Sequence, residues 1–425
     1  MRKKLLKNAI IPNLSAKTLD KGDILIDEKG IIAAIGEIEG ALSDGALVID
    51  CEGKYALPGF IDLHCHLREP GFEYKETIAT GTAAAAAGGY TTVVAMPNTK
   101  PAVDSAEVVN YILSKAEAEG SCTVLTTANI TVGAMGEELV DFDALYNAGA
   151  VAFTDDGKPV SNPAVMREAM KRCAERNYLI MSHSEELALA EGGAMNEGFT
   201  AKKLSVKGIP DSAESVAVAR EVLLAEETGC RLHICHVSTE ASLNIIRDAK
   251  KRGVKVTCET CPHYFFFDDT AVEAYGVNAK MSPPLRSAKC VEAIKEGLAD
   301  GTIDCISTDH APHSEEEKNA GLAKAPNGIT GIQTAFSAAV TALLNTGFID
   351  IFRLVELTSA KPAAIIGIKS GIRVGNLANI CIADIGKKYT LEKSMLKSKS
   401  FNTPFIGITL SGTVEHTINN GEIRV

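Results

Sequence analysis

The sequence predicts an α/β protein, a (β/α)₈ TIM barrel with a small β-sandwich domain built from both chain ends. Three observations lead to this fold. Apolar strand-like runs alternate with helix-like segments through the middle of the chain, and polar residues follow nearly every run. Short strand-like runs with glycine turns occupy roughly the first and last 55 residues. With 425 residues, the chain is long enough for one large domain and a smaller one.

The strand-like runs of the middle region are rich in apolar and β-branched residues and end in polar ones. They are FIDLHCH (60–66), TTVVAMPN (91–98), CTVLTTANI (122–130), AVAFTDDG (150–157), YLIMSHSE (178–185), RLHICHVS (231–238), VKVTCETCPH (254–263) and IDCISTDHAPH (303–313). Segments with a helical period follow most of them, at 106–120, 165–177, 214–229, 239–253 and 288–301. A doubly wound open sheet is the alternative. That fold usually has a glycine-rich phosphate loop after its first strand, and HCHLREPG (64–71) is not one.

The two chain ends carry strand-like segments without a long helix, at 23–36, 46–57, 378–390 and 412–425. Because the termini of a compact domain commonly lie close together, we expect both ends to form one small β-domain. The predicted division is 1–57 with 370–425 for this domain, and 58–369 for the barrel.

Composition restricts the partners and the compartment. The net charge of −11 argues against nucleic acid and acidic membrane surfaces and leaves a small anionic substrate open, since local cations can override the overall sign. No secretory signal and no apolar run of membrane-spanning length is visible. The 11 cysteines are odd in number and scattered, which favours reduced thiols in the cytoplasm. We expect the CxxC at Cys258 and Cys261 to be buried packing thiols, since no second pair completes a metal site.

The first strand-like run ends in two histidines. His64 and His66 are two residues apart, so in a strand both imidazoles face the same side. Two neutral nitrogen donors at a strand end suit a divalent metal. Arg68 follows two residues later and is suited to bind a carboxylate. Cys65, between the histidines, is expected to point away from the metal.

Further candidate ligands end the later strands, where the active sites of such barrels lie. They are Asp156 in FTDDG, His183 in MSHSE, His236 in HICHVS and Asp309 in STDHAPH. Alternation alone leaves open whether Asp155 or Asp156 faces inward. His233 points to the opposite face from His236 and is expected to pack or to support the site. Four histidines and two aspartates form a set large enough for two metals, and this donor mixture suits Zn²⁺ best.

This constellation resembles the amidohydrolase superfamily, which has HxH after strand one, a bridging residue after strand four, His after strands five and six, and Asp after strand eight. Within the superfamily, HCHLREPG and STDHAPHSEEEK resemble the two signature segments of dihydroorotases. FTDDG, MSHSEE, HICHVST and KMSPPLR fall between them in the expected order. The resemblance covers essentially the whole chain.

The resemblance implies two zinc ions. One would be bound by His64, His66 and Asp309, and the second by His183 and His236, with Asp156 as the bridge. Asp309 would also carry the proton. Some relatives bridge with a carboxylated lysine instead, whereas Lys158 of this chain is expected at the surface.

The resemblance further implies a substrate site. Arg68, Asn98 and His313 match positions that hold the substrate carboxylate. Ser282, Asn327 and Gly328 lie in segments that complete the site, although the family usually has Asn at the first position and an aromatic residue at the second. The implied reaction is the reversible cyclisation of N-carbamoyl-L-aspartate to L-dihydroorotate, the third step of pyrimidine synthesis.

Two alternative functions stay open. The first is another cyclic-amide hydrolase, such as a hydantoinase or an allantoinase, although these relatives usually lack an arginine at the position of Arg68. The second is an inactive barrel that serves as a structural partner of aspartate transcarbamoylase, although inactive relatives lose metal ligands. A homodimer and an association of the active enzyme with aspartate transcarbamoylase are further expectations. The segment 312–328 is either a solvated loop or a mobile edge of the site.

Overall fold

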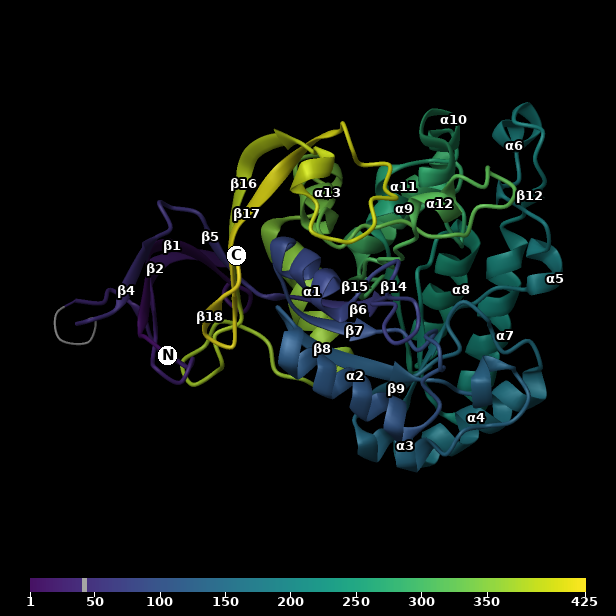
Figure 1. Cartoon of the computed structure of the whole chain (residues 1–425), viewed down its shortest axis with the longest axis horizontal. Helices are drawn as coiled ribbons and strands as arrows, with labels where there is room; N and C mark the ends of the chain where they lie inside the picture. Colours follow the sequence, from purple (N-terminus) through teal and green to yellow (C-terminus); the bar gives the residue numbers. More distant parts are fainter. Residues whose placement is uncertain (40–43) are drawn as a thin grey trace.

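Eight parallel strands in the middle of the chain form a nearly closed barrel (Figure 1). The computed structural model describes residues 1–39 and 44–425. Neighbouring strands pair in chain order, and the chain after the last strand returns to the first, where the amide of His66 donates to the carbonyl oxygen of His310 at 2.8 Å. The barrel strands are β6 (Phe60–Cys65), β7 (Tyr90–Ala95), β8 (Thr123–Ala128), β9 (Ala150–Phe153), β10 (Leu179–Ser182), β13 (Arg231–Ile234), β14 (Val256–Thr260) and β15 (Cys305–Ile306). All eight predicted strands are confirmed, and the open-sheet alternative is wrong.

Helices cover the outside of the barrel and join its strands. They are α1 (Ile78–Ala87), α2 (Ala106–Glu119), α3 (Phe142–Ala148), α4 (Pro163–Arg176), α7 (Ser212–Thr228), α8 (Glu240–Lys251), α11 (Ala288–Asp300), α13 (Ala335–Ala339), α14 (Ile351–Val355) and α15 (Lys361–Ile366). In α8, the side chain of Thr239 accepts a hydrogen bond from the amide of Ser242 and so caps the helix. Leu243, Ile246 and Ala249 recur at every third position and are buried. A cap and an apolar face of this kind explain why the segment is helical and which side faces the strands.

Shorter elements lie in the connections. They are α5 (Leu187–Ala190), α6 (Phe199–Lys203), α9 (Pro262–Phe266), α10 (Ala271–Tyr275), α12 (Glu315–Lys318), the 3₁₀ or π turns η2 (Val132–Ala134), η3 (Gly276–Ala279), η4 (Val340–Leu344), η5 (Glu356–Ala360) and η6 (Lys393–Met395), and the paired strands β11 (Met195–Asn196) and β12 (Gly208–Ile209). Among the described residues, no helix has the length and apolar character required to cross a membrane.

The strands of the two chain ends form a second sheet beside the barrel, as Figure 1 shows. The predicted small β-domain is thus present. Its strands make one continuous curled sheet, because β5 pairs with β1 on one side and with β16 on the other. The strands are β1 (Lys4–Asn13), β2 (Thr18–Ile26), β3 (Ile32–Gly36), β4 (Leu47–Asp50), β5 (Tyr55–Pro58), β16 (Ile380–Thr390), β17 (Thr409–Asn419) and β18 (Glu422–Ile423).

Strand β16 connects the cores of the two parts. Ile380 and Ile382 pack inside the curled sheet, whereas Cys381 and Ala383 join the main apolar cluster of the barrel. This follows from the two-residue alternation of a strand, which lets a strand with apolar residues at successive positions bury both faces. The curled sheet is therefore fixed against the barrel by packing.

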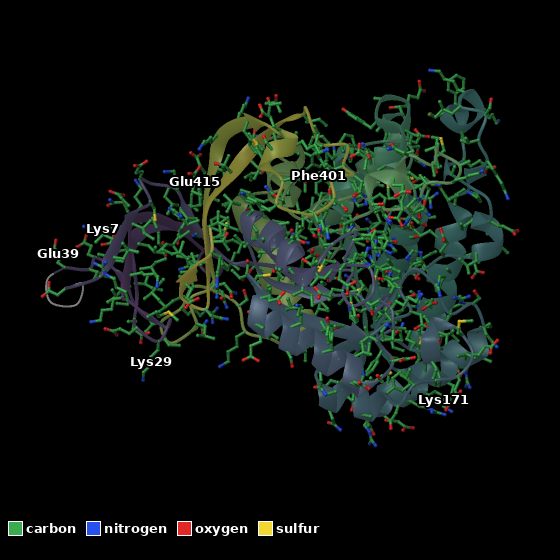
Figure 2. All side chains as sticks on the ribbon, viewed as in Figure 1. Lys7, Lys29, Glu39, Lys171, Phe401 and Glu415 are labelled. Carbon is green, nitrogen blue, oxygen red and sulfur yellow. The ribbon has the colours of Figure 1, made fainter. Side chains whose placement is uncertain are left out.

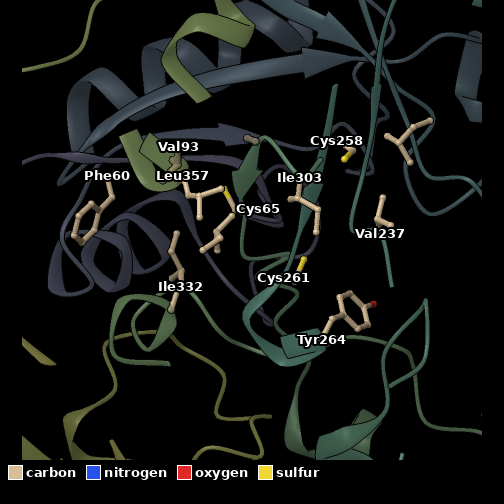
Figure 3. Close-up of a cluster of buried hydrophobic side chains, with 14 of the residues drawn as sticks. Phe60, Cys65, Val93, Val237, Cys258, Cys261, Tyr264, Ile303, Ile332 and Leu357 are labelled. Atoms are coloured by element: carbon tan, nitrogen blue, oxygen red, sulfur yellow. The ribbon is translucent and has the colours of Figure 1, made fainter. Parts of the chain in front are cut away.

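Side chains fill the space between the barrel strands and the helices, as Figure 2 shows, so the barrel is a packed core. Figure 3 shows Cys258 and Cys261 among apolar side chains of this core. Burial raises the pKa of the Cys258 thiol to about 12. All 11 cysteines are free and buried, which confirms the prediction of packing thiols.

The first and last barrel strands are also linked through a buried carboxylate. Asp62 on β6 accepts hydrogen bonds from the amide of Thr308 at 2.9 Å and from the amide of His64 at 3.1 Å. The hydroxyl of Thr308 donates to its other oxygen. Burial raises the pKa of Asp62 to about 7.

Replacing Asp62 with Ala should therefore destabilise the barrel, because three buried donors lose their acceptor. We expect the free energy of unfolding in urea to fall by on the order of 3 kcal/mol. Glu117→Ala, at an exposed position on α2, serves as the control and should leave stability within error of the parent. An unchanged unfolding midpoint in Asp62→Ala would show that the barrel does not depend on this link.

Candidate active site and metal centre

A cavity of about 380 Å³ opens at the carboxyl ends of the barrel strands. Eleven of the twelve predicted site residues line it, and His64 lies buried beside it. The lining residues from the prediction are His66, Arg68, Asn98, Asp156, His183, His236, Ser282, Asp309, His313, Asn327 and Gly328, and Gly157, Glu185, Leu187 and Ala311 complete the wall. The structure thus brings the predicted residues together from distant parts of the chain.

Three of these residues have a left-handed backbone. The φ angles are 61° at Arg68, 37° at His236 and 44° at Asp309. Residues other than glycine rarely adopt this conformation, and such strain concentrates at functional sites. Each residue lies two or three positions after the end of a barrel strand, and its side chain lines the cavity.

The Asp156 carboxylate lies at the centre of the cluster and is 3% exposed. Its oxygens are 3.3 Å from His64 Nε2, 3.5 Å from His66 Nε2, 3.4 Å from His183 Nδ1 and 3.7 Å from His236 Nε2. Burial disfavours its ionisation, but the surrounding imidazoles, His64 foremost, hold the pKa of Asp156 well below its usual range. A charge at this position faces four nitrogen donors at once.

The neighbouring Asp155 is turned away from the cavity, which answers the question that alternation left open. Its carboxylate accepts hydrogen bonds from the amides of Ile130 and Thr131, at 2.8 and 3.2 Å, and from the side chains of Asn129 and Thr131. Asp155 therefore holds the loop after β8, and Asp156 faces the site.

Asp309 lies on the opposite side of the first two imidazoles. Its Oδ1 is 3.0 Å from His66 Nε2 and 3.6 Å from His64 Nε2. Burial opposes ionisation, yet the hydrogen bond from His66 and the nearby imidazoles lower the pKa of Asp309 to about 2. The carboxylate is thus held in the charged form that a metal or a proton transfer requires.

The donor set fits divalent cations. His64 Nε2 and Asp156 Oδ1 are buried and have no hydrogen-bond partner among the described residues. Ligand atoms of a tetrahedral zinc ion lie about 3.4 Å apart, close to the separations observed here. Two groups made only of predicted ligands have all their donor atoms within 4.8 Å of one another, His64 with His66 and Asp309, and His64 with Asp156 and His236. Unpartnered buried donors at ligand spacing indicate a site built for cations.

An outer acceptor orients the far nitrogen of three of the imidazoles. His64 Nδ1 is 2.9 Å from Glu259, and His66 Nδ1 is 2.9 Å from the amide oxygen of Asn98. His183 Nε2 is 3.8 Å from Glu185. Acceptors of this kind fix the tautomer and ring orientation of metal-ligating histidines. They leave Nε2 of the first two rings and Nδ1 of His183 directed at Asp156.

Glu259 and Glu185 are the two site residues that the sequence prediction missed. Glu259 on β14 is fully buried and also contacts His233 Nε2 at 3.2 Å and the hydroxyl of Ser307. Burial opposes its ionisation, but hydrogen bonds from His233 and His64 lower the pKa of Glu259. The sequence feature that could have indicated Glu259 is that it is a single acidic residue inside an apolar strand-like run. The supporting role expected for His233 agrees with this contact.

Arg68 supplies the cation of the site. It is 9% exposed, its Nε donates to the carbonyl oxygen of Pro312 at 3.1 Å, and its Nη2 is 3.3 Å from His313 Nε2. Within residues 1–39 and 44–425, no carboxylate lies within ion-pair distance of its guanidinium. Burial and the charge of Arg68 lower the pKa of His313 to about 3, so that this imidazole is neutral. The cavity therefore contains one buried guanidinium that its own chain leaves without an anion.

The other predicted substrate residues lie around this pair. Asn98 Nδ2 is 3.4 Å from Asp156, so its amide also supports the histidine–aspartate cluster. The hydroxyl of Ser282 donates to Glu185 at 3.1 Å. The carbonyl oxygen of Asn327 is 2.8 Å from His313 Nε2. Ser282, which is shorter than the asparagine usual in the family, thus forms a hydrogen bond with Glu185 of the cavity wall.

Two buried lysines hold the segment 312–328 at the edge of the cavity. Lys318 Nζ donates to the carbonyl oxygens of Pro326 and Gly328, both at 3.0 Å. Lys280 Nζ donates to the carbonyl oxygen of Ala325 at 2.7 Å. These contacts make the segment a fixed wall in this structure. The expected surface position of Lys158 and the outward direction of Cys65, whose thiol faces the carbonyl oxygen of Val94, are confirmed.

Sequence comparison relates the whole chain to known enzymes. The dihydroorotase of Trichlorobacter lovleyi is 47% identical over 420 residues, which are 99% of this chain and 98% of that protein. The dihydroorotase of Caldanaerobacter subterraneus is 49% identical over 406 residues, 95% of this chain and 93% of that protein. The chain belongs to the dihydroorotase family. A family profile described as dihydro-orotase-like matches residues 53–242 of this family member.

Solved structures place the dihydroorotase-family chain among amidohydrolase barrels. The L-hydantoinase (dihydropyrimidinase) of Arthrobacter aurescens superposes with a TM-score of 0.88 at 26% identity, covering 100% of this chain and 96% of that one. The D-hydantoinase (dihydropyrimidinase) of a Thermus species gives a TM-score of 0.84 at 27% identity, covering 99% and 94%. The predicted resemblance and fold class are confirmed.

The outer carboxylate of this family member gives a testable prediction. Glu259→Gln keeps the size of the side chain but removes the charge that faces His64 Nδ1. We expect zinc affinity, measured against a competing chelator, to fall by about 10- to 100-fold. Glu227→Gln at an exposed position on α7 is the matched control. Equal zinc affinity in the two variants would mean that Glu259 does not support the metal centre.

Proposed function

We propose that this chain catalyses the reversible cyclisation of N-carbamoyl-L-aspartate to L-dihydroorotate, with two zinc ions per subunit. The observation that carries the proposal is the unpaired, buried guanidinium of Arg68 beside the histidine–aspartate cluster. Dihydroorotate combines a cyclic amide, which a hydrolytic centre opens, with a carboxylate, which needs a cation. The near full-length similarity to dihydroorotases supports the same assignment.

The residues present fit the two cations. His64, His66 and Asp309 would hold one ion, His183 and His236 the other, and Asp156 would lie between them. Zinc in such a site polarises a carbonyl group and lowers the pKa of bound water.

Asp309 is the proposed proton carrier. In ring opening, water adds to the amide carbonyl and the carbon–nitrogen bond breaks. Asp309 accepts a proton from the water and delivers it to the departing ring nitrogen, and the reverse direction moves the same proton back. Proton transfer by a positioned side chain typically contributes about 10²- to 10⁴-fold to the rate.

Arg68, Asn98 and His313 would hold the carboxylate that does not react. A guanidinium offers two parallel N–H donors to a carboxylate. Neutral His313, whose Nε2–H is directed at the carbonyl oxygen of Asn327, would lie beside the carboxylate without adding a second charge. Ser282, Asn327 and Gly328 would close the other side of the ring. An anchor of this kind fixes the ring so that its amide faces the reacting groups.

The second candidate is a hydantoinase or allantoinase, because the structural relatives include hydantoinases. Hydantoin and allantoin carry no carboxylate, so binding them would leave Arg68 buried without an anion. Comparing turnover of dihydroorotate, hydantoin and allantoin by the zinc-loaded protein tests the choice. Preferential turnover of dihydroorotate supports the proposal, and preferential turnover of either other compound rejects it.

We further propose the division into a composite β-domain (1–57 and 370–425) and a catalytic barrel (58–369). A reducing compartment such as the cytoplasm suits the 11 free thiols. A homodimer and an association with aspartate transcarbamoylase stay predictions, which sedimentation of the protein alone and mixed with the transcarbamoylase would test.

Arg68→Ala should lower kcat/KM for dihydroorotate by about 100-fold or more, chiefly through KM, because the substrate carboxylate loses its charged partner. Zinc content should equal that of the parent. Arg68→Lys should restore little of the loss, since an ammonium cannot reproduce the two-pronged contact. If zinc were lost in parallel with activity, Arg68 would belong to the metal site and the assignment would be wrong.

Asp309→Asn should abolish turnover at every pH from 6 to 9, since an amide cannot accept and return the proton. Circular dichroism should show an unchanged fold. The assay follows the formation and loss of dihydroorotate. Substantial residual turnover at any of these pH values would remove Asp309 from its role.

A further inference from the structure

A second cavity, of about 390 Å³, lies behind the segment 312–328. Its volume falls in the range of small-molecule sites, about 300–1,000 Å³. His313 lines both this cavity and the catalytic one, so the two cavities share this residue in their walls. The second cavity is outside the site proposed for the reaction.

The charges around the second cavity are mainly positive. Lys318, Lys393 and Lys399 line it, against one acid, Glu315. Lys393 and Lys399 against Glu315 already leave an excess of positive charge, in a protein whose net charge is −11, and buried Lys318 adds to this excess when it is protonated. Concentrated local charge of the sign opposite to the overall charge indicates an anionic ligand.

These lysines are weakly neutralised. Lys393 Nζ is 3.9 Å from Glu315, and Lys399 Nζ donates to the backbone carbonyl oxygen of Glu73 at 2.6 Å. Lys318 is 3% exposed and has only carbonyl oxygens as acceptors in the described part of the chain. Burial, with a smaller contribution from Lys280, lowers the pKa of Lys318 to about 7, as expected for an ammonium that lacks a counter-ion.

Aromatic side chains form another part of the wall. Phe401 and Tyr74 line the cavity, and Lys393 Nζ lies 4.7 Å from the centroid of the Phe401 ring. The Tyr74 side chain is 55% exposed. An aromatic face beside exposed ammonium groups suits a ligand that combines a flat ring with an anion.

We propose that the second cavity binds a nucleoside monophosphate, with its phosphate at Lys393 and Lys399 and its base against Phe401. Such a ligand matches the three features of the cavity, its volume, its positive charge and its aromatic face. The proposal does not depend on the reaction catalysed in the neighbouring cavity.

The wall between the two cavities offers a route by which this ligand acts on the substrate site. Asn402 lines the second cavity, and its Nδ2 donates to the carbonyl oxygen of Gly328 at 3.0 Å. Lys318 donates to the same oxygen. The amide of His313 donates to Asn402 Oδ1 at 3.1 Å. Because Gly328 and His313 also line the catalytic cavity, a bound nucleotide would change substrate affinity.

Titration calorimetry of the purified protein with uridine 5′-monophosphate, uridine and inorganic phosphate tests the proposal. We expect one nucleotide per chain, with phosphate and uridine binding at least about fivefold more weakly than the nucleotide. Lys393→Ala with Lys399→Ala should weaken nucleotide binding by about tenfold or more. Phe401→Leu should weaken the nucleotide and leave phosphate unchanged. The absence of nucleotide binding at about 1 mM nucleotide would overturn the proposal.

Two controls locate the binding. Lys29→Ala with Lys171→Ala removes the same charge from exposed positions that Figure 2 shows far from Phe401, and should leave the affinity unchanged. Arg68→Ala should also bind the nucleotide normally. If Arg68→Ala lost binding while the Lys393/Lys399 variant kept it, the nucleotide would occupy the catalytic cavity, and the proposal would be wrong.

The effect of the nucleotide on the substrate site is measured in a separate experiment. Saturating nucleotide should change KM for dihydroorotate by about threefold or more in the parent, with kcat unchanged, and should have no effect in the Lys393/Lys399 variant. This measurement rests on the proposed function, whereas calorimetry does not, so the two can fail separately. An unchanged KM in the nucleotide-saturated parent would reject the coupling.

Discussion

The carboxylate of Asp156 is the constraint on which the site depends. Taking a charge out of water is costly unless partners compensate for the lost hydration. Four imidazoles at 3.3–3.7 Å surround this charge, and they come from three different strand ends. The arrangement requires that β6, β10 and β13 deliver their side chains to one point. The barrel is the scaffold that meets this requirement, because its parallel strands all end on the same face.

The polar groups behind the histidine–aspartate cluster are positioned as closely as the residues of the cluster itself. Glu259 and Asn98 each engage the far nitrogen of a histidine, so that the near nitrogen faces the centre. Asp155 and Asp62 use their carboxylates on backbone amides of adjoining strands and loops. Of the four buried aspartates in this region, Asp62 and Asp155 therefore hold the frame, and Asp156 and Asp309 face the cavity. This division explains how a dense cluster of charge is compatible with a rigid barrel.

Much of the fold and of the site follows from the sequence, because strand burial and the common end of parallel strands are local regularities. The pair His64 and His66 and the later strand ends could be assigned in this way. The inward choice of Asp156 over Asp155 could not, because it depends on hydrogen bonds to the loop after β8. Glu259 was missed because the sequence around an acid inside an apolar strand does not indicate which residue the acid contacts. The pairing of β5 with both β1 and β16 joins segments more than 300 residues apart, which no local pattern specifies.

The most direct test is anomalous diffraction at the zinc edge from crystals of the zinc-loaded protein. Two peaks should flank the Asp156 carboxylate, one within about 2.2 Å of donor atoms of His64, His66 and Asp309, and the other at the same distance from His183 and His236. No peak at Asp156, or zinc held instead by the thiols of Cys258 and Cys261, would contradict the account.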